Sequence, residues 1–174
     1  MTEKYERYMV DWDDLHKRFQ TGPCFICQIV ARNPLYPAHI IYEDETVIAF
    51  LDKYPVLYGY TLVCPREHRE QVTGDFTLSE YLGLQERVYR ISEAVRQEVK
   101  AERVYLLTLG SQEGNTHVHW HIVPLPPGIA YREQQLYIFR RDILKIPEEE
   151  SVSLASRIRE RIKPLANDGE KRYK

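Results

Sequence analysis

Three histidines at alternate positions have the clearest potential for chemistry in this chain. They are His117, His119 and His121, and apolar residues stand between them. Side chains alternate between the two faces of a strand, so this spacing predicts three imidazoles on one face and apolar packing on the other. Three interpretations follow: a polar sheet face that uses histidine, a three-histidine metal site, and nucleophilic or acid–base catalysis by imidazole. We favour catalysis, because threonine or lysine would suffice on a polar face and no further histidine follows His121.

Other elements must position this strand, and the sequence pattern predicts them. Apolar residues at spacings of three and four predict a long helix over residues 78–99, and Thr77 with Glu80 is typical of a capping box at its start. Runs of β-branched and apolar residues predict strands, and two shorter stretches predict helices. The strands cover 40–43, 46–51, 60–64, 104–109 and 118–123, the helices cover 11–20 and 151–163, and residues 132–146 fit either helix or strand. The close spacing of the strands favours an α+β fold with an antiparallel sheet.

The composition narrows the class of protein. The chain has 174 residues, 43% of them hydrophobic and 29% charged, with a formal net charge of −2. These values predict one globular domain with a sizeable core. The balanced charge gives no electrostatic case for nucleic-acid binding, no apolar run is long enough for a membrane span, and the charged N-terminal stretch lacks the apolar block of a signal peptide. Three cysteines are too few for a disulfide scaffold, so we expect a reduced, cytoplasmic protein.

Four segments of the chain resemble, in order, the histidine triad (HIT) family in its Hint- and Fhit-like part. They are residues 24–27 (CFIC), 42–52 (YEDETVIAFLD), 59–68 (GYTLVCPREH) and 117–124 (HVHWHIVP), which together span about residues 24–124. The resemblance implies a five-stranded antiparallel sheet with the long helix packed against it. We expect a single domain over residues 1–163, a flexible tail over 164–174, and a homodimer, since relatives are commonly homodimers.

The resemblance also implies a mechanism. His119 takes the position of the family's nucleophile, which attacks the α-phosphorus of a nucleotide to form a nucleotidyl-histidine that water then hydrolyses. His121 takes the position that contacts the phosphate. Gln112, in a loop shorter than is usual in the family, resembles the residue that orients the bridging or leaving oxygen. Asn115 and Thr116 could donate hydrogen bonds to phosphate oxygens, although ordinary turn chemistry also explains these two residues and Gln112.

A nucleotide pocket follows from the same resemblance. Asp52 matches the acidic position that binds the ribose hydroxyls, and two acceptor oxygens suit a vicinal diol. Phe50, Leu51 and Leu62 would line the pocket of the base, for which we expect adenine. A place in the ordinary core also explains these three apolar residues.

Two cysteines add a metal site to the resemblance. Some bacterial members carry a structural zinc bound by a Cys-x-x-Cys pair, a histidine after a Pro-x-x segment and the first triad histidine. Here those residues are Cys24, Cys27, His68 and His117, which make a closed Cys₂His₂ set. The alternatives are a thioredoxin-like redox pair, whose usual strand-to-helix context is missing, and a pair of buried thiols.

Tyr60 departs from the family pattern, because many relatives have histidine after the glycine at this point. A phenol donates a hydrogen bond but does not accept a proton at neutral pH, so the departure concerns how the imidazoles are ordered. The expected activity is that of a nucleotide hydrolase or nucleotidyl transferase acting on a dinucleoside polyphosphate such as diadenosine tetraphosphate. The alternatives are a nucleoside phosphoramidase that uses the same histidine, a zinc-stabilised nucleotide-binding module with little turnover, and a three-histidine metallohydrolase.

Overall fold

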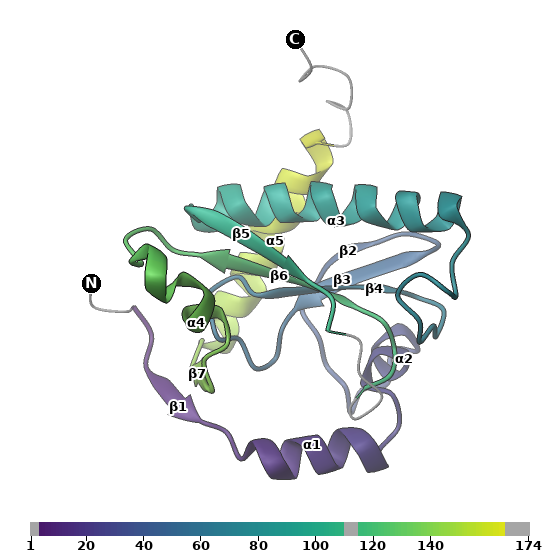
Figure 1. Cartoon of the computed structure of the whole chain (residues 1–174), viewed down its shortest axis with the longest axis horizontal. Helices are drawn as coiled ribbons and strands as arrows, with labels where there is room; N and C mark the ends of the chain where they lie inside the picture. The colour runs from purple at the N-terminus through teal and green to yellow at the C-terminus, as the bar shows by residue number, and fades with distance from the viewer. Residues whose placement is uncertain (1–3, 110–114, 166–174) are drawn as a thin grey trace.

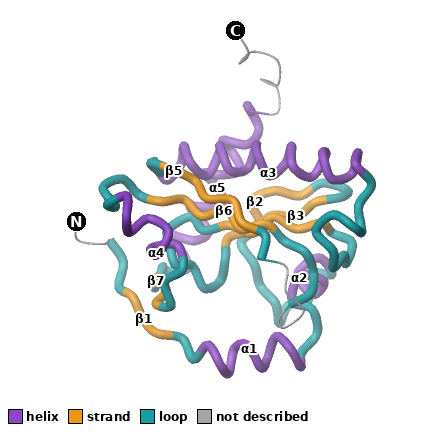
Figure 2. Tube along the Cα trace, in the orientation of Figure 1, coloured by secondary structure: helices purple, strands orange, loops and turns teal. Residues whose placement is uncertain are grey.

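A five-stranded antiparallel sheet lies at the centre of the structure (Figures 1 and 2). The structure is a computed structural model that describes residues 4–109 and 115–165. The strand order is β2-β3-β4-β6-β5, and every neighbouring pair is antiparallel. The strands are β2 (Ile40–Glu43), β3 (Val47–Leu51), β4 (Thr61–Pro65), β5 (Arg103–Leu107) and β6 (Trp120–Leu125). The predicted α+β fold is confirmed, and each strand boundary lies within two residues of its prediction.

Two helices cover one face of the sheet. α3 (Leu78–Val99) matches the predicted helix at both ends, and Thr77 forms the predicted capping box with Glu80. α5 (Glu148–Leu165) begins before the predicted residue 151. Their apolar faces meet the strands in a core cluster in which Val63, Ile91 and Ile122 are fully buried, and burying each such side chain contributes roughly 1.5–3 kcal/mol. In the described part of the chain no helix is long and apolar enough to cross a membrane.

The opposite face of the sheet carries α2 (Phe25–Val30), which is too short to show a helical period in the sequence. Cys24 is the N-cap of this helix, and its Sγ accepts a hydrogen bond from the backbone amide of Cys27. Ile26 and Ile29 pack into a second cluster with residues of β3 and β4. The helix therefore holds both cysteines against the sheet.

A second, two-stranded sheet joins the N-terminal part of the chain to the region before α5. In it β1 (Arg7–Met9) pairs antiparallel with β7 (Asp142–Leu144). α1 (Trp12–Thr21) follows β1 close to the predicted residues 11–20, and the Trp12 indole donates a hydrogen bond to the carbonyl of Arg141 at 2.7 Å. The stretch 132–146, which fitted helix or strand, contains both, since η1 (Tyr131–Glu133) leads into α4 (Gln134–Ile138) and then β7.

The histidine segment enters the sheet later than predicted. β6 begins at Trp120, so of the three histidines only His121 lies in a strand. The backbone amide of Val118 instead donates to the carbonyl of Arg69 at 2.7 Å, which explains the late start. The predicted alternation of faces still holds, because the apolar residues of the segment are buried in the core cluster against α3. They are Val118, Trp120 and Ile122.

The turn before β4 depends on Gly59. Its φ of 85° lies in the left-handed region that L side chains rarely adopt, and a Cβ there would lie 2.7 Å from Cγ1 of Val99. The turn leads into Tyr60, whose amide donates to the carbonyl of Leu57 at 3.1 Å. The carbonyl of Tyr60 accepts from the amide of Asp52 at 2.9 Å. Hydrogen bonds therefore fix the backbone of Tyr60 on both sides.

The turn between β2 and β3 is anchored to α3 through Asp44. Its Oδ1 accepts from the backbone amides of Thr46 and Val47, both at 2.8 Å. Its Oδ2 accepts from the Tyr42 hydroxyl at 2.8 Å and from Nε of Arg87 at 2.9 Å. Burial opposes ionisation, but these hydrogen bonds outweigh it and hold the pKa of Asp44 well below its usual range.

Candidate active site and metal centre

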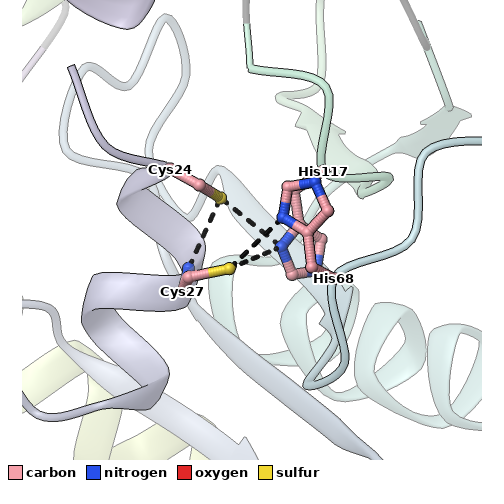
Figure 3. A group of neighbouring side chains, drawn as sticks. All are labelled: Cys24, Cys27, His68 and His117. Carbon is pink, nitrogen blue, oxygen red and sulfur yellow. Dashed lines mark hydrogen bonds between the residues drawn. The ribbon is translucent and has the colours of Figure 1, made fainter.

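Four metal-ligating side chains converge where α2 meets the segment before β6. They are Cys24, Cys27, His68 and His117, and their ligand atoms all lie within 4.8 Å of one another (Figure 3). Sγ of Cys27 is 3.3 Å from Nδ1 of His68, and both sulfurs are 3.5 Å from Nδ1 of His117. Tetrahedral zinc, with bonds of about 2.3 Å to sulfur and about 2.0 Å to nitrogen, separates such ligands by about 3.5 Å. The donor set and its spacing therefore fit a closed tetrahedral metal site.

Further hydrogen bonds orient both imidazoles of the cluster. Nε2 of the buried His117 lies 2.9 Å from the carbonyl oxygen of Pro65, so Nε2 donates and Nδ1 turns its lone pair toward the thiols. Nε2 of His68 lies 3.3 Å from Oε1 of Glu70, and that oxygen also accepts from the hydroxyl of Thr116 at 3.1 Å. Partners of this kind fix the tautomer of a ligating histidine and raise its basicity.

The thiol of Cys24 does not have the lowered pKa of a reactive thiol. Burial raises the pKa of the Cys24 thiol to about 11, whereas a reactive Cys-x-x-Cys pair has a lowered pKa. A bound cation would be needed to hold Cys24 as the thiolate. The spacing of the four ligand atoms, together with the raised pKa of Cys24, favours the metal interpretation over the thioredoxin-like one.

The two remaining triad histidines lie side by side next to the cluster, with ring centroids 4.7 Å apart. Nδ1 of His119 is 2.7 Å from the carbonyl oxygen of His117, so Nδ1 carries a proton and donates it. The other ring nitrogen, Nε2, then has a free lone pair. A neutral imidazole in this tautomer is a nucleophile without any additional base. His117 thus contributes its ring to the cluster of cysteines and histidines and its carbonyl to the hydrogen bond with His119.

Burial keeps the three imidazoles uncharged at neutral pH. It lowers the pKa of His117 to about 4 and that of His121 to about 3. Burial also lowers the pKa of His119, although the hydrogen bond to the carbonyl of His117 opposes the change. Before any substrate reacts, these three imidazoles therefore offer lone pairs and N–H donors rather than imidazolium charge.

An apolar cluster adjoins the triad, and its members Phe50 and Leu62 are buried while Phe25 is partly exposed. Strand register pairs Phe50 with Leu62 and Leu62 with His121, so the three side chains share one face of the sheet. Phe25 of α2 lies over this row, with its ring edge-on to Phe50 at 6.5 Å and to His119 at 6.4 Å between centroids. A flat apolar group bound beside Phe25 would lie next to His119.

Asp52 lies beside Tyr60, because its backbone amide donates to the carbonyl of Tyr60. It follows β3, and its Oδ1 accepts from the amide of Tyr54 at 2.7 Å. Burial raises the pKa of Asp52 to about 6 against the opposing effect of that hydrogen bond. The neighbouring Tyr60 places its hydroxyl 3.0 Å from Nδ1 of His121. Tyr60 therefore links the Asp52 end of the site to the triad.

The other predicted site residues fall in different places. Leu51 lies on the opposite face from Phe50 and packs in the core against α3 and α5, so the structure does not bring it to the predicted base pocket. The hydroxyl of Thr116 is bonded to a carboxylate beside the metal cluster. Among the described residues, the buried amide nitrogen of Asn115 has no hydrogen-bond partner. Gln112 lies outside the described residues.

Two residues of the site were not predicted from the sequence. Phe25 stands in a helix of six residues, where no periodicity marks which face is buried. Glu70 stands two positions after His68, and this spacing is the single sequence signal for its contact with the imidazole.

The chain is similar to known proteins over most of this structure. The model of the HIT domain matches residues 33–127. A protein from Saccharolobus solfataricus, named an uncharacterized HIT-like protein, is 39% identical over 107 residues, which are 58% of this chain and 73% of that one. A crystal structure of a hypothetical histidine triad nucleotide-binding protein from Sulfolobus tokodaii has a TM-score of 0.69 at 29% identity, and covers 87% of this chain and 100% of its own.

A zinc-bound histidine triad family protein from Mycobacterium smegmatis shares the fold, with a TM-score of 0.65 at 24% identity over 83% of this chain and 96% of that one. The family model covers more than half of this chain and includes the triad, Asp52 and His68. The chain therefore belongs to the histidine triad (HIT) family.

Proposed function

We propose that this chain cleaves a dinucleoside polyphosphate, of the diadenosine tetraphosphate type, at the α-phosphorus through a nucleotidyl-histidine. Membership of the HIT family supports the general class of nucleotide hydrolases and nucleotidyl transferases. The observation that carries the proposal is the hydrogen bond from His119 Nδ1 to the carbonyl of His117, which leaves a nucleophilic Nε2 beside His121.

The reaction has two displacements at one phosphorus atom. In the first, the lone pair of His119 Nε2 forms a P–N bond while the P–O bond to the rest of the polyphosphate breaks, and ATP leaves. The ring becomes positively charged, and its Nδ1–H bond to the carbonyl of His117 stabilises that charge. In the second, water attacks the phosphorus and loses one proton to solvent, the P–N bond breaks, and its electron pair returns to Nε2, which leaves His119 neutral again. One water is consumed, and AMP and ATP are the products.

The apolar cluster beside the triad supports a nucleoside as the substrate. In the proposal, adenine packs against the partly exposed edge of this cluster at Phe25, with Phe50 and Leu62 buried beneath it, and Asp52 accepts hydrogen bonds from the ribose hydroxyls. His121 donates to a phosphate oxygen. The unpartnered amide of Asn115, among the described residues, is a second candidate donor to phosphate.

We assign zinc to the cluster of two cysteines and two histidines. The ligand spacing and the zinc-bound relative from Mycobacterium smegmatis support this assignment. A closed four-ligand ion supplies a cross-link between α2 and the segment before β6, while the chain's own residues carry out the chemistry. We also propose that the chain forms a homodimer, which sedimentation velocity would measure. We place the protein in the cytoplasm, where thiolate ligands stay reduced.

Product analysis with His119→Ala tests the proposal. Wild type and variant are each incubated with diadenosine tetraphosphate and with adenosine phosphoramidate, and nucleotides are separated by chromatography. Wild type is expected to yield AMP and ATP, and the variant to lose roughly a thousandfold or more in kcat/KM. His16→Ala is the matched control, because His16 is an exposed histidine on α1.

Each outcome separates the candidate functions. Turnover of the phosphoramidate alone would assign the site to P–N hydrolysis by the same histidine. Adenosine binding without turnover of either compound would favour a binding module. Full activity in His119→Ala would exclude this histidine as the nucleophile.

A further inference from the structure

Tyr60 carries a largely buried hydroxyl that the proposed reaction does not use. This hydroxyl lies 3.0 Å from Nδ1 of His121, and the two rings meet edge to face with centroids 5.8 Å apart and planes at 86°. The sheet builds this contact, because β4 starts one residue after Tyr60 and pairs with β6 through Leu62 and His121. The Gly59 turn fixes the backbone just before it.

The direction of this hydrogen bond decides what His121 can do for a phosphate. If the phenol donates to Nδ1, the ring proton lies on Nε2, and the Nε2–H can donate to a phosphate oxygen. If Nδ1 donates to the phenol, Nε2 carries a lone pair, which repels an anionic oxygen. Burial raises the pKa of Tyr60 above its ordinary value, so the phenol keeps the proton that it would donate.

We propose that Tyr60 is a positioning residue, which donates to Nδ1 and so fixes His121 as the tautomer with its proton on Nε2. The inference rests on the proposed function of the triad. It gives two neighbouring neutral rings opposite roles. His119, fixed by the carbonyl of His117, presents a lone pair, and His121, fixed by Tyr60, presents a proton.

A phenol suits this role better than a group that titrates near pH 7. A phenol O–H is a stronger hydrogen-bond donor than a neutral imidazole N–H, and the imidazole lone pair is a stronger acceptor than a phenol oxygen, so donation from Tyr60 to Nδ1 is the more stable of the two arrangements. An imidazole in the same place could donate or accept, and would leave the tautomer of His121 undetermined. Without the hydroxyl of Tyr60, we expect His121 to sample both tautomers.

Nitrogen NMR of the free protein, labelled with ¹⁵N-histidine, reads the tautomer directly. At neutral pH, His121 in wild type is expected to show a protonated Nε2 and an unprotonated Nδ1. Tyr60→Phe keeps the ring and removes the donor, so a mixture of tautomers is expected, with kcat lowered about tenfold and KM changed less than about twofold. Tyr105→Phe is the matched control, because the Tyr105 hydroxyl is bonded to Gln134 at 3.2 Å.

Two results would overturn the proposal. One is a wild-type spectrum with the proton on Nδ1 of His121. The other is a Tyr60→Phe protein that keeps one tautomer and full kcat. The spectrum needs no substrate, so it decides the tautomer even if neither nucleotide is turned over, and even if Tyr60→Phe does not fold. Failure of this inference is therefore distinguishable from failure of the proposed activity.

Discussion

Replacement of Cys27 tests whether the cluster is a metal cross-link. Sγ of Cys27 lies within 3.5 Å of the ligand nitrogens of both His68 and His117, so its loss removes a ligand that contacts both imidazoles of the set. A serine hydroxyl is a poor substitute for a thiolate on zinc. Cys27→Ser is therefore expected to abolish the stabilisation by zinc while it changes the metal-free protein little.

The size of the effect follows from the length of chain that the ion closes. Cys27 is 41 residues from His68 and 90 residues from His117. In the chain-entropy model, a cross-link over the longer span lowers the entropy of the unfolded state and so stabilises the folded state by about 4–5 kcal/mol. A domain of this size gains about 2–4 °C in Tm per kcal/mol, so saturating zinc should raise the Tm of wild type by about 8–20 °C.

The assay is thermal unfolding of chelator-treated protein, with and without added zinc. Cys64→Ala is the matched control, because Cys64 is fully buried in the core beneath α2 and is not a member of the cluster. Its loss should lower Tm equally in both conditions and leave the shift with zinc intact. Equal shifts in wild type and Cys27→Ser would refute the cluster as the site. No shift in wild type would refute a stabilising metal.

Two further predictions concern carboxylates with shifted pKa values. Asp44→Asn should lower the free energy of unfolding by about 2–3 kcal/mol at pH 7, because an amide has one acceptor oxygen and cannot accept both from the turn amides and from Tyr42 with Arg87. The folded pKa of Asp44 lies below the unfolded value of about 4, so this stabilisation is present above pH 4 and lost as pH falls below it. Urea titrations at pH 7 and pH 3.5 should show that the difference in free energy of unfolding between wild type and Asp44→Asn is smaller at pH 3.5. An equal difference at the two pH values would contradict this role of Asp44. Asp52 has its pKa raised to about 6, so adenosine should bind about tenfold more weakly at pH 5 than at pH 7.5. Calorimetry that finds no such change, or finds it unaltered in Asp52→Asn, would remove Asp52 from the ribose site.

The parts of the fold that were predictable are those set by local pattern. The helix over 78–99 combines a 3.6-residue apolar period with a capping box at Thr77, so both its face and its start are encoded nearby. β1 and β7 have three residues each and exist because residues 7–9 pair with residues 142–144. No local pattern reports a pairing across that distance.

The candidate site divides in the same way. The ligand set of the metal cluster followed from the family resemblance, and the structure brings those four residues together. Successive side chains along β3 point to opposite faces of the sheet, so Phe50 and Leu51 could not both line one pocket. In the structure, Phe50 packs in the cluster with α2, and Leu51 packs in the cluster with α3 and α5. The contact of Phe25 with His119 depends on how α2 docks, which is a tertiary property.

The pairing of β1 with β7 bears on the order in which the protein folds and opens. The hydrogen bond from Arg7 to the carbonyl of Asp142 joins residues 135 apart, and the small sheet has three residue pairs. Closing so long a loop costs chain entropy before any contact is made, so the central sheet should form first and β1 should dock last. The same thin connection should open first under mild denaturation. When β1 separates from β7, β4 stays paired with β6 and α2 stays packed on the central sheet. The triad can therefore stay assembled while the N-terminal strand is released.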